Sequence, residues 1–247
     1  AELRQAGTAG TGLTVDHPGL DLDLAYAVQE AGVRLLVAAG EHPLGFKLGL
    51  TSQAKQAQMG VGEPLYGELT DRMLLDVGQP LDTTDLIQPR VEPEIAFLLG
   101  ADLAGARVGA AQVLAATAAV TPAIDVLDSR YAGYSFTLPD VVADNASAAH
   151  LALGGVRRST DGIDLRLVGC VLERNGRLVS TAAGAAALGH PAAAVSWLVR
   201  ALAGRGRGVH AGDVVLSGGL TEAVAVAPGD VVVAHLGRLG TVELAVR

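Results

Sequence analysis

The sequence predicts an α+β fold, and three observations support this class. Strand-like segments follow one another through most of the second half, and two of them flank Asn175-Gly176, a strong signal for a hairpin turn. Apolar residues show helical spacing at only a few places. No change of composition marks a linker, so residues 1–247 are predicted to form one domain, with a small helical part at 1–60 and a β-rich core at 61–247.

The first half of the chain is predicted to alternate helices and strands. A helix is expected over 21–39, where apolar residues lie near helical spacing and Gly40 follows as a stop. Ser52 is a typical N-cap residue for a short helix that ends at Met59. The other segments expected in this half are a strand at 45–50, an irregular stretch at 60–88, a strand at 90–99, a helix near 110–118, a strand near 119–128 and a polar connection at 129–147.

From residue 148 onward, β patterns dominate and turn signals separate the strands. Pro191 begins the one helix expected here, 191–202, because the first helical position needs no backbone N–H. Pro228-Gly229-Asp230 marks a turn between two strands. The strands are expected at 165–172, 178–181, 213–217, 222–226, 230–236 and 240–246.

Composition argues against several classes of protein. The net charge is −8 and no basic stripe is visible, which argues against nucleic acid and against an anionic membrane surface as partners. Glycines and Pro191 interrupt the Ala-rich runs, so no membrane-spanning segment is predicted. Cys170 is the single cysteine and is predicted to be a buried structural thiol. With no disulfide framework and no visible signal peptide, we expect a cytoplasmic protein.

The strand expected at 90–99 carries two glutamates two residues apart. Side chains alternate along a strand, so Glu92 and Glu94 point to the same face, about 6–7 Å apart. Two neighbouring anions in an apolar run repel each other, and a hard divalent cation is the natural partner of their oxygens. The alternative is a solvent-facing strand that carries two ordinary glutamates.

A third carboxylate should come from a neighbouring strand. Asp125 is the best candidate because it interrupts an apolar strand pattern, where an unpaired carboxylate is costly. Asp128 is a rival, but it stands where the strand ends and is suited to capping a turn. Three carboxylates with no histidine nearby favour Mg²⁺ or Mn²⁺ over Zn²⁺.

Two further residues are candidates for chemistry. Lys47 is a charge within an apolar run, so it either faces a site and holds an anion or lies at a solvent-facing strand edge, and the residues alone favour neither. Asp71 lies in the irregular stretch, where a role in a turn is more common than catalysis. Neither a Gly-x-Ser-x-Gly elbow nor a phosphate-binding loop motif occurs in the sequence.

Six short motifs follow one another along the chain. They are GFKLGLTS at 45–52, QMGV at 58–61, PRVEPEIA at 89–96, DSR at 128–130, VADNAS at 142–147 and LGHP at 188–191. Together they resemble the 2-keto-4-pentenoate hydratase and 4-oxalocrotonate decarboxylase family, which is part of the fumarylacetoacetate hydrolase superfamily. The resemblance covers nearly the whole chain, and it implies the mixed β-sandwich or roll of that superfamily.

The resemblance also implies roles for individual residues. Glu92, Glu94 and Asp125 match the residues that hold Mg²⁺ or Mn²⁺, although relatives commonly have Glu where this chain has Asp125. Lys47 and Asp71 match the catalytic lysine and aspartate, which are expected to pair with each other. Two residues are expected to contact the substrate, and these are Arg130 and Ser147.

Within the family, several segments favour the decarboxylase branch, namely 54–61, 128–131, Phe136 with Leu138, and 218–221. The implied reaction is the decarboxylation of 2-oxo-3-hexenedioate to 2-hydroxypenta-2,4-dienoate in the meta-cleavage degradation of aromatic compounds. The alternatives are a hydratase of 2-hydroxypenta-2,4-dienoate, a C–C bond hydrolase of an acylpyruvate, and a noncatalytic partner of another pathway enzyme. A homo-oligomer is implied as well, with association with the pathway hydratase as a further expectation.

Overall fold

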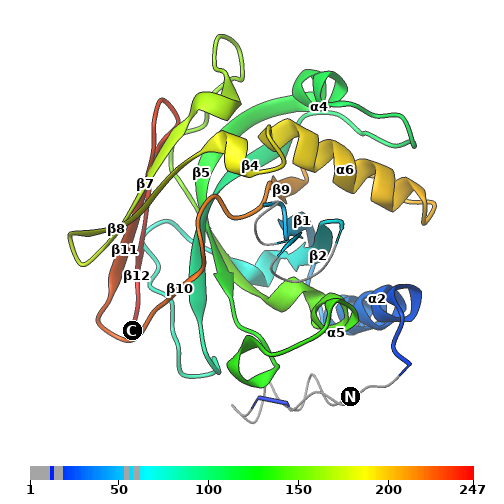
Figure 1. Ribbon diagram of the computed structural model, residues 1–247, viewed down its shortest axis with the longest axis horizontal. Helices are drawn as coiled ribbons and strands as arrows, with labels where there is room; N and C mark the ends of the chain where they lie inside the picture. The colour runs from blue at the N-terminus through cyan, green and yellow to red at the C-terminus, as the bar shows by residue number, and fades with distance from the viewer. Residues whose placement is uncertain (1–11, 14–18, 53–55, 58–61) are drawn as a thin grey trace.

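Two β-sheets form the framework of the fold (Figure 1). The computed structural model describes residues 12, 13, 19–52, 56, 57 and 62–247. The larger sheet is strongly curved and has eight strands. In spatial order they are β2 (Leu65–Thr70), β1 (Pro43–Gly49), β9 (Val214–Leu216), β4 (Arg90–Leu99), β5 (Thr117–Leu127), β6 (Ala148–Leu153) and β3 (Leu74–Leu75), and β10 (Val224–Ala225) pairs with β4.

The smaller sheet is antiparallel throughout and lies on the left in Figure 1. Its strands, in spatial order, are β12 (Gly240–Ala245), β11 (Val231–Leu236), β7 (Gly169–Arg174) and β8 (Arg177–Ala183). The turn between β7 and β8 has positive φ at Asn175 and Gly176, as the tight hairpin turn signalled by this dipeptide requires. Alternate residues of β11 and β12 are buried in the core that also contains β5.

Four α-helices flank the sheets in the described part of the chain. They are α2 (Leu22–Ala38), α4 (Ala110–Ala116), α5 (Leu138–Ala143) and α6 (Pro191–Ala203). The Asp21 carboxylate caps α2 by accepting the backbone N–H of Leu24 at 2.8 Å. Helix α2 packs against α5, and α6 packs against α4 (Figure 1). Short 3₁₀ turns are η1 (Asp71–Met73), η2 (Ala132–Tyr134), η3 (Asn145–Ser147), η4 (Leu165–Leu167) and η5 (Gly184–Ala186).

The buried side chain of Gln29 ties α2 to the layer beneath it. Its Nε2 atom donates to the carbonyls of Tyr66 in β2 and Val142 in α5, at 2.9 and 2.8 Å. Cys170 is buried and unpaired by disulfide, as predicted, and burial raises the pKa of its thiol to about 11. No helix among the described residues is long and apolar enough to cross a membrane.

The predicted fold class is confirmed, and most elements begin and end near the predicted residues. The stretch at 60–88, predicted to be irregular, contains the fully buried strand β2, because its glycine and glutamate disguise an apolar strand pattern. The segment at 165–172 begins as a 3₁₀ turn before β7, and the connection at 129–147 contains α5 and two 3₁₀ turns. The helix expected between Ser52 and Met59 lies largely outside the described residues.

Candidate metal and active site

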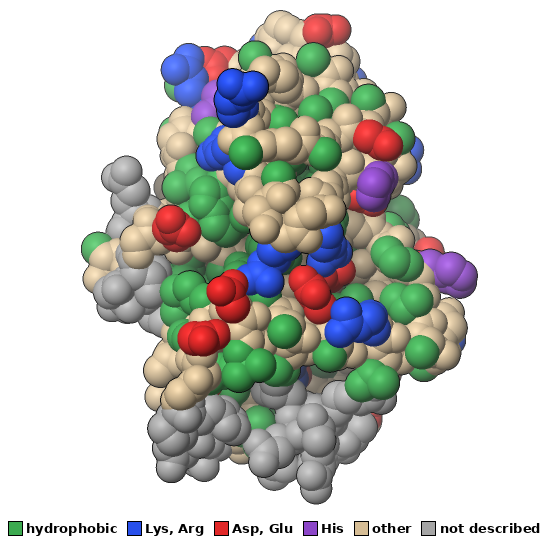
Figure 2. Space-filling model, turned by 90° about the vertical axis from the view of Figure 1, so that its right-hand side faces the viewer, with side chains coloured by type: hydrophobic (Ala, Val, Ile, Leu, Met, Phe, Trp, Pro, Cys, Tyr) green, Lys and Arg blue, Asp and Glu red, His purple; other side chains and the backbone are tan. Residues whose placement is uncertain are grey.

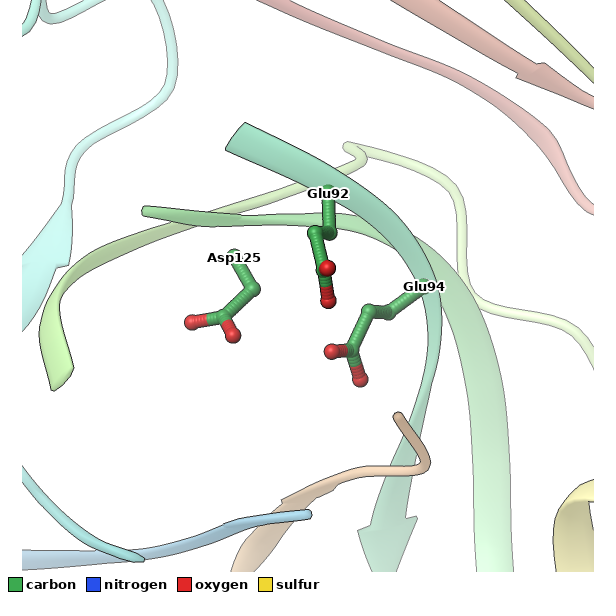
Figure 3. Close-up of side chains that lie close together, drawn as sticks. All are labelled: Glu92, Glu94 and Asp125. Carbon is green, nitrogen blue, oxygen red and sulfur yellow. The ribbon is translucent and has the colours of Figure 1, made fainter. Parts of the chain in front are cut away.

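Three carboxylates meet where β4 and β5 pair. Glu92 stands directly opposite Asp125 in the antiparallel register, and Glu94 follows on the same face of β4. One oxygen of each carboxylate lies within 4.8 Å of the others, and the three side chains point toward one another (Figure 3). Glu94 is 0% exposed, Asp125 is 1% exposed and Glu92 is 8% exposed. The alternative of two ordinary solvent-facing glutamates is therefore wrong.

This cluster concentrates negative charge in the core. Burial raises the pKa of Glu94 well above its usual value, and the neighbouring charges of Asp125 and Glu92 raise it further. Lys47 and the backbone N–H of Gly218 act in the opposite direction. A single ammonium does not balance three carboxylates, so the site favours an additional cation.

The geometry fits a hard divalent ion. Glu94 Oε1 is buried and accepts no hydrogen bond from the described residues, whereas Glu94 Oε2 accepts the N–H of Gly218 at 2.6 Å. The next residue, Gly219, passes so close that a Cβ atom there would lie 1.9 Å from Glu92 Oε2. A glycine loop thus closes tightly over the carboxylates. Oxygen ligands alone suit Mg²⁺ or Mn²⁺.

Lys47 faces this site, which decides between the two roles that the sequence left open. Its side chain is 1% exposed, and Nζ lies 2.5 Å from Asp125 Oδ2. Nζ also donates to the carbonyl oxygen of Ala146 at 3.1 Å. The buried ammonium is therefore held at a fixed position beside the carboxylates.

The carbonyl that binds Lys47 belongs to a strained turn. Asn145, Ala146 and Ser147 have φ values of 54°, 54° and 55°, in the left-handed region that non-glycine residues rarely adopt. The Asn145 side chain anchors the turn to β2, since it accepts the N–H of Glu68 and donates to its carbonyl, both at 2.8 Å. A Cβ atom on Gly67 would lie 2.5 Å from the Asn145 carbonyl, so this close approach requires glycine.

Arg130 supports the same turn from behind. Its Nε donates to Asp144 Oδ1 at 2.6 Å, its Nη2 donates to the Asp144 carbonyl, and its Nη1 donates to the carbonyls of Asp128 and Ala148. Asp144 Oδ2 in turn accepts the hydroxyl of Ser147 at 3.1 Å. The expected contact of Arg130 with substrate finds no support, because its guanidinium is engaged by the protein and does not line the cavity described below.

Asp71 lies elsewhere, and its expected pairing with Lys47 is wrong. Its side chain is 47% exposed and bonds to His42, with Oδ1 accepting the backbone N–H at 2.9 Å and Oδ2 lying 3.0 Å from the ring Nδ1. Lys47 is paired in the sheet with Gly67, four residues before Asp71 and therefore about 13 Å away along β2. The partner of Lys47 is Asp125.

A cavity of about 160 Å³ opens beside Lys47 and Glu92. Ser147, Tyr134 and Phe136 line it and come from the segment at 129–147, which the sequence predicted to be a polar connection. The remaining lining is apolar or backbone and comprises Leu48, Gly49, Leu50, Leu65, Leu127, Val141 and Ala146. Sequence reasoning missed these residues, because an apolar side chain in a strand or helix carries no signal that distinguishes a cavity wall from the core.

Comparisons with known proteins show which family the chain resembles. Residues 54–247 match the fumarylacetoacetate (FAA) hydrolase C-terminal family. The chain is 46% identical to a 4-oxalocrotonate decarboxylase of Pseudomonas sp. (strain CF600), over 88% of this chain and 83% of that protein. It is 41% identical to a 2-keto-4-pentenoate hydratase of Paraburkholderia xenovorans (strain LB400), over 98% of this chain and 90% of that protein.

A solved structure is also very similar. The 4-oxalocrotonate decarboxylase from Pseudomonas putida G7, complexed with magnesium and adipate, superimposes with a TM-score of 0.96 at 40% identity and covers 99% of this chain and 94% of that chain. A second structure of that enzyme is complexed with calcium and acetate and gives a TM-score of 0.94 at 39% identity, again over 99% of this chain and 94% of that chain.

These findings confirm the predicted family, fold class and type of cofactor. The relatives are decarboxylases and hydratases, so the prediction of a carbon–carbon lyase, with a hydro-lyase as the alternative, agrees with them. Divalent ions in similar structures agree with a divalent-cation site at the acidic cluster of this chain. The chain belongs to the fumarylacetoacetate hydrolase family.

Proposed function

We propose that this protein is a metal-dependent decarboxylase that converts 2-oxo-3-hexenedioate (4-oxalocrotonate) to 2-hydroxypenta-2,4-dienoate and carbon dioxide in meta-cleavage aromatic degradation. The observation that carries the proposal is the contrast within one cavity, where Lys47 and Glu92 adjoin a lining that is mostly apolar. A 2-oxo acid requires the charged groups, whereas an apolar wall favours a carboxylate that leaves as neutral carbon dioxide. Adipate, bound by the similar decarboxylase, is a six-carbon dicarboxylate like the proposed substrate.

The proposed substrate carries its own electron sink. When the C5–C6 bond breaks, C6 leaves as carbon dioxide and its electron pair remains on C5. The pair moves through C4 and C3 and becomes negative charge on the C2 oxygen, giving a dienolate. Protonation of that oxygen yields 2-hydroxypenta-2,4-dienoate, so no organic cofactor is needed.

The carboxylates and Lys47 have different roles in this reaction. A divalent ion held by Glu92, Glu94 and Asp125 would supply Lewis-acid stabilisation to the oxygen that becomes negative. The Lys47 ammonium has three N–H donors, and two of them point to Asp125 and to the Ala146 carbonyl. The third N–H is left to bind the substrate and to deliver a proton to the C2 oxygen.

The turn at Ala146 positions that donor. Arg130 and Asp144 fix the turn, so their contribution to the reaction is the orientation of Lys47 through the Ala146 carbonyl. Ser147 lines the cavity, and we propose that its hydroxyl binds the substrate. The apolar lining keeps water from the carboxylate that is lost.

A hydratase is the second candidate, because a 2-keto-4-pentenoate hydratase is 41% identical over 98% of the chain. That reaction adds water to the dienoate, so it needs a group that activates water at the far carbon. Among the described residues that line the cavity, no carboxylate other than Glu92 is available for this task. The cavity therefore favours decarboxylation over hydration.

A product assay tests the choice. The enzyme with Mg²⁺ is incubated with 2-oxo-3-hexenedioate, with 2-hydroxypenta-2,4-dienoate and with an acylpyruvate, and products are followed by NMR. Carbon dioxide and the dienoate from the first substrate support the proposal. A 4-hydroxy-2-oxo acid from the second, or pyruvate from the third, at a higher kcat/KM than the first reaction would overturn it.

Three other predictions remain proposals. We infer a homo-oligomer from the family resemblance and from the need to protect sheet edges. Association with the pathway hydratase would pass the dienoate between two enzymes. We propose a cytoplasmic location, because the single cysteine, Cys170, can form no disulfide within the chain. Co-purification from the source cytosol tests the last two.

A further inference from the structure

Strands β1 and β2 carry the Lys47 site on one face and an ion pair on the other. Side chains alternate along a strand, so Lys47 faces the active site while its neighbour Phe46 points to the outer face. Phe46 is paired in the sheet with Glu68, and Lys47 is paired with Gly67. The outer pair therefore lies directly behind the residue that is proposed to donate the proton.

Arg207 holds this outer pair together. Its Nη1 and Nη2 atoms donate to the two carboxylate oxygens of Glu68 at 2.6 and 2.9 Å. Its guanidinium carbon lies 5.6 Å from the centre of the Phe46 ring. The backbone N–H of Arg207 donates to the carbonyl of Leu202 at 2.9 Å, which ties Arg207 to the last turn of α6. Arg207 thus fixes β1 and β2 to a helix on the outer side of the sheet.

Glu68 carries this restraint to the inner face through its backbone. The N–H and the carbonyl of Glu68 bond to the side chain of Asn145, both at 2.8 Å. Asn145 precedes Ala146, whose carbonyl accepts the Lys47 ammonium at 3.1 Å. A continuous chain of covalent and hydrogen bonds therefore joins Arg207 on the outer face to Lys47 Nζ on the inner face.

We propose that Arg207 is a positioning residue for the Lys47 ammonium, an inference that rests on the proton-donating role of Lys47 in the proposed function. Glu68 is 9% exposed, so without Arg207 its carboxylate would be buried without this counterion. The carboxylate would turn toward water and move the backbone that holds Asn145. The Ala146 carbonyl would then shift together with the ammonium, and a misplaced proton donor lowers the rate.

The outer face is open to solvent at Arg207. A cavity of about 750 Å³ has Phe46, Glu68 and Arg207 in its lining, whereas Lys47 is 1% exposed. Figure 2 views the molecule from the side on which α6 ends in Figure 1, and basic and acidic side chains lie together near the centre of this face. A small cation can therefore reach Glu68 from water in a variant that lacks the Arg207 side chain.

Steady-state kinetics at saturating Mg²⁺ provide the first test. Arg207→Ala is expected to lower kcat about tenfold at unchanged Mg²⁺ affinity, because Arg207 lies on the opposite face from the metal site. Guanidinium chloride at millimolar concentration should restore part of the lost kcat, since the ion can bind the Glu68 carboxylate as the side chain does. Methylammonium chloride should restore less, because it lacks the bidentate fork.

Arg205→Ala is the matched control for these measurements. Arg205 lies in the same loop after α6, but it pairs with Asp23, whose side chain is 96% exposed, and its guanidinium lies over the ring of Tyr26. It makes no contact of this kind with β1 or β2, so kcat of Arg205→Ala should equal that of the wild type and should not respond to guanidinium.

A double-mutant cycle tests whether Arg207 acts through Lys47. In a chain that already carries Lys47→Met, Arg207→Ala should change kcat by less than about twofold, because the ammonium that it positions is absent. A loss in that chain as large as the loss in the wild-type chain would reveal a general disturbance of the site and would overturn the proposal.

A spectroscopic test needs no substrate, so it stands apart from the proposed reaction. The sequence contains two lysines, Lys47 and Lys55, so labelling with ε-¹³C-lysine gives two NMR signals, and Lys47→Met identifies the first of them. In the Mg²⁺-loaded protein, Arg207→Ala should shift the Lys47 signal and guanidinium should move it back. Arg205→Ala should leave it in place.

The Lys47 signal decides the proposal even if the proposed function fails. A wild type that turns over none of the candidate substrates would refute that function, whereas an unshifted Lys47 signal in a folded Arg207→Ala variant would refute the role of Arg207. Circular dichroism shows whether the variant is folded. If it is not, Arg207→Lys takes its place, because it keeps the charge but loses the fork, and it should shift the signal by a smaller amount. An unshifted signal in Arg207→Lys would then overturn the proposal.

Discussion

Replacing Lys47 with methionine separates proton donation from metal binding. Methionine has nearly the length of lysine but no ammonium, so the variant keeps the shape of a side chain that is 1% exposed. Loss of a hydrogen bond to a charged oxygen costs about 1.5–3 kcal/mol in the transition state. Loss of a positioned proton donor costs about 10²-fold or more in rate. We therefore expect kcat to fall by about 10²-fold or more.

The Mg²⁺ affinity of Lys47→Met, unlike its kcat, is not expected to fall. Lys47 Nζ lies 2.5 Å from Asp125 Oδ2 and neutralises part of the charge of the three carboxylates. Without it, the carboxylates attract a cation more strongly, so the Mg²⁺ affinity should stay the same or rise. In the metal-free protein, removal of one partner of a buried ion pair costs about 3–5 kcal/mol. The melting temperature should fall in the absence of Mg²⁺ and recover in part when Mg²⁺ is added.

Steady-state kinetics at saturating Mg²⁺, together with calorimetric Mg²⁺ titration, measure these two effects. Asp71→Asn is the matched control, because Asp71 lies on the surface and bonds to His42, so its kcat should stay near that of the wild type. Near-wild-type turnover in Lys47→Met would refute the proposed role of Lys47. A large loss of turnover in Asp71→Asn would show that Asp71 takes part in the reaction despite its exposed position beside His42.

Three further substitutions test the surroundings of the cavity. Arg130→Lys keeps the charge but loses the guanidinium that donates to the Asp144 carboxylate and to three backbone carbonyls. We expect kcat to fall about tenfold while the Mg²⁺ affinity stays unchanged. A kcat equal to that of the wild type would contradict the positioning role of Arg130. Gly219→Ala would place a Cβ atom 1.9 Å from Glu92 Oε2, so calorimetry should show Mg²⁺ binding weakened about tenfold or more. Gly67→Ala would place a Cβ atom 2.5 Å from the Asn145 carbonyl and should lower the free energy of unfolding by about 1–3 kcal/mol, whereas an unchanged denaturant midpoint would show that the turn yields easily.

The acidic cluster could be predicted from the sequence because its physical cause is local. Glu92 and Glu94 interrupt an apolar strand at a spacing of two, and this alone places both on one face. The sequence favours Asp125 over Asp128 because Asp125 lies inside a strand pattern rather than at its end. The structure agrees, since the Asp128 carboxylate accepts the backbone N–H groups of the segment before β4 and so has a structural task.

The partner of Lys47 could not be predicted, because it depends on register between strands. Asp71 is nearer in sequence, but β1 and β2 pair so that Lys47 lies beside Gly67, whereas Asp71 lies in η1, beyond the end of β2. Asp125 reaches Lys47 from β5, although β1 and β5 are separated by two strands in the sheet, because the sheet is strongly curved. Such closeness across a curved sheet has no signature in a single sequence.

Strand β2 and the role of Arg130 were missed for a similar reason. Glu68 interrupts an apolar pattern in the sequence, yet it is buried because Arg207, far along the chain, donates two hydrogen bonds to its carboxylate at 2.6 and 2.9 Å. Arg130 reads as a substrate ligand beside aromatic residues. Its donors are instead used by Asp144 and by backbone carbonyls that only the folded turn brings together.

The central claim is that the three buried carboxylates hold one divalent cation, and calorimetric titration of Mg²⁺ tests it most directly. We predict one ion per chain for the wild type. Glu94→Gln keeps the shape of a fully buried side chain, so its circular dichroism spectrum should be unchanged. We predict that its Mg²⁺ affinity is weaker than that of the wild type by about 100-fold or more. Equal affinity in the wild type and in a folded Glu94→Gln variant would contradict the account.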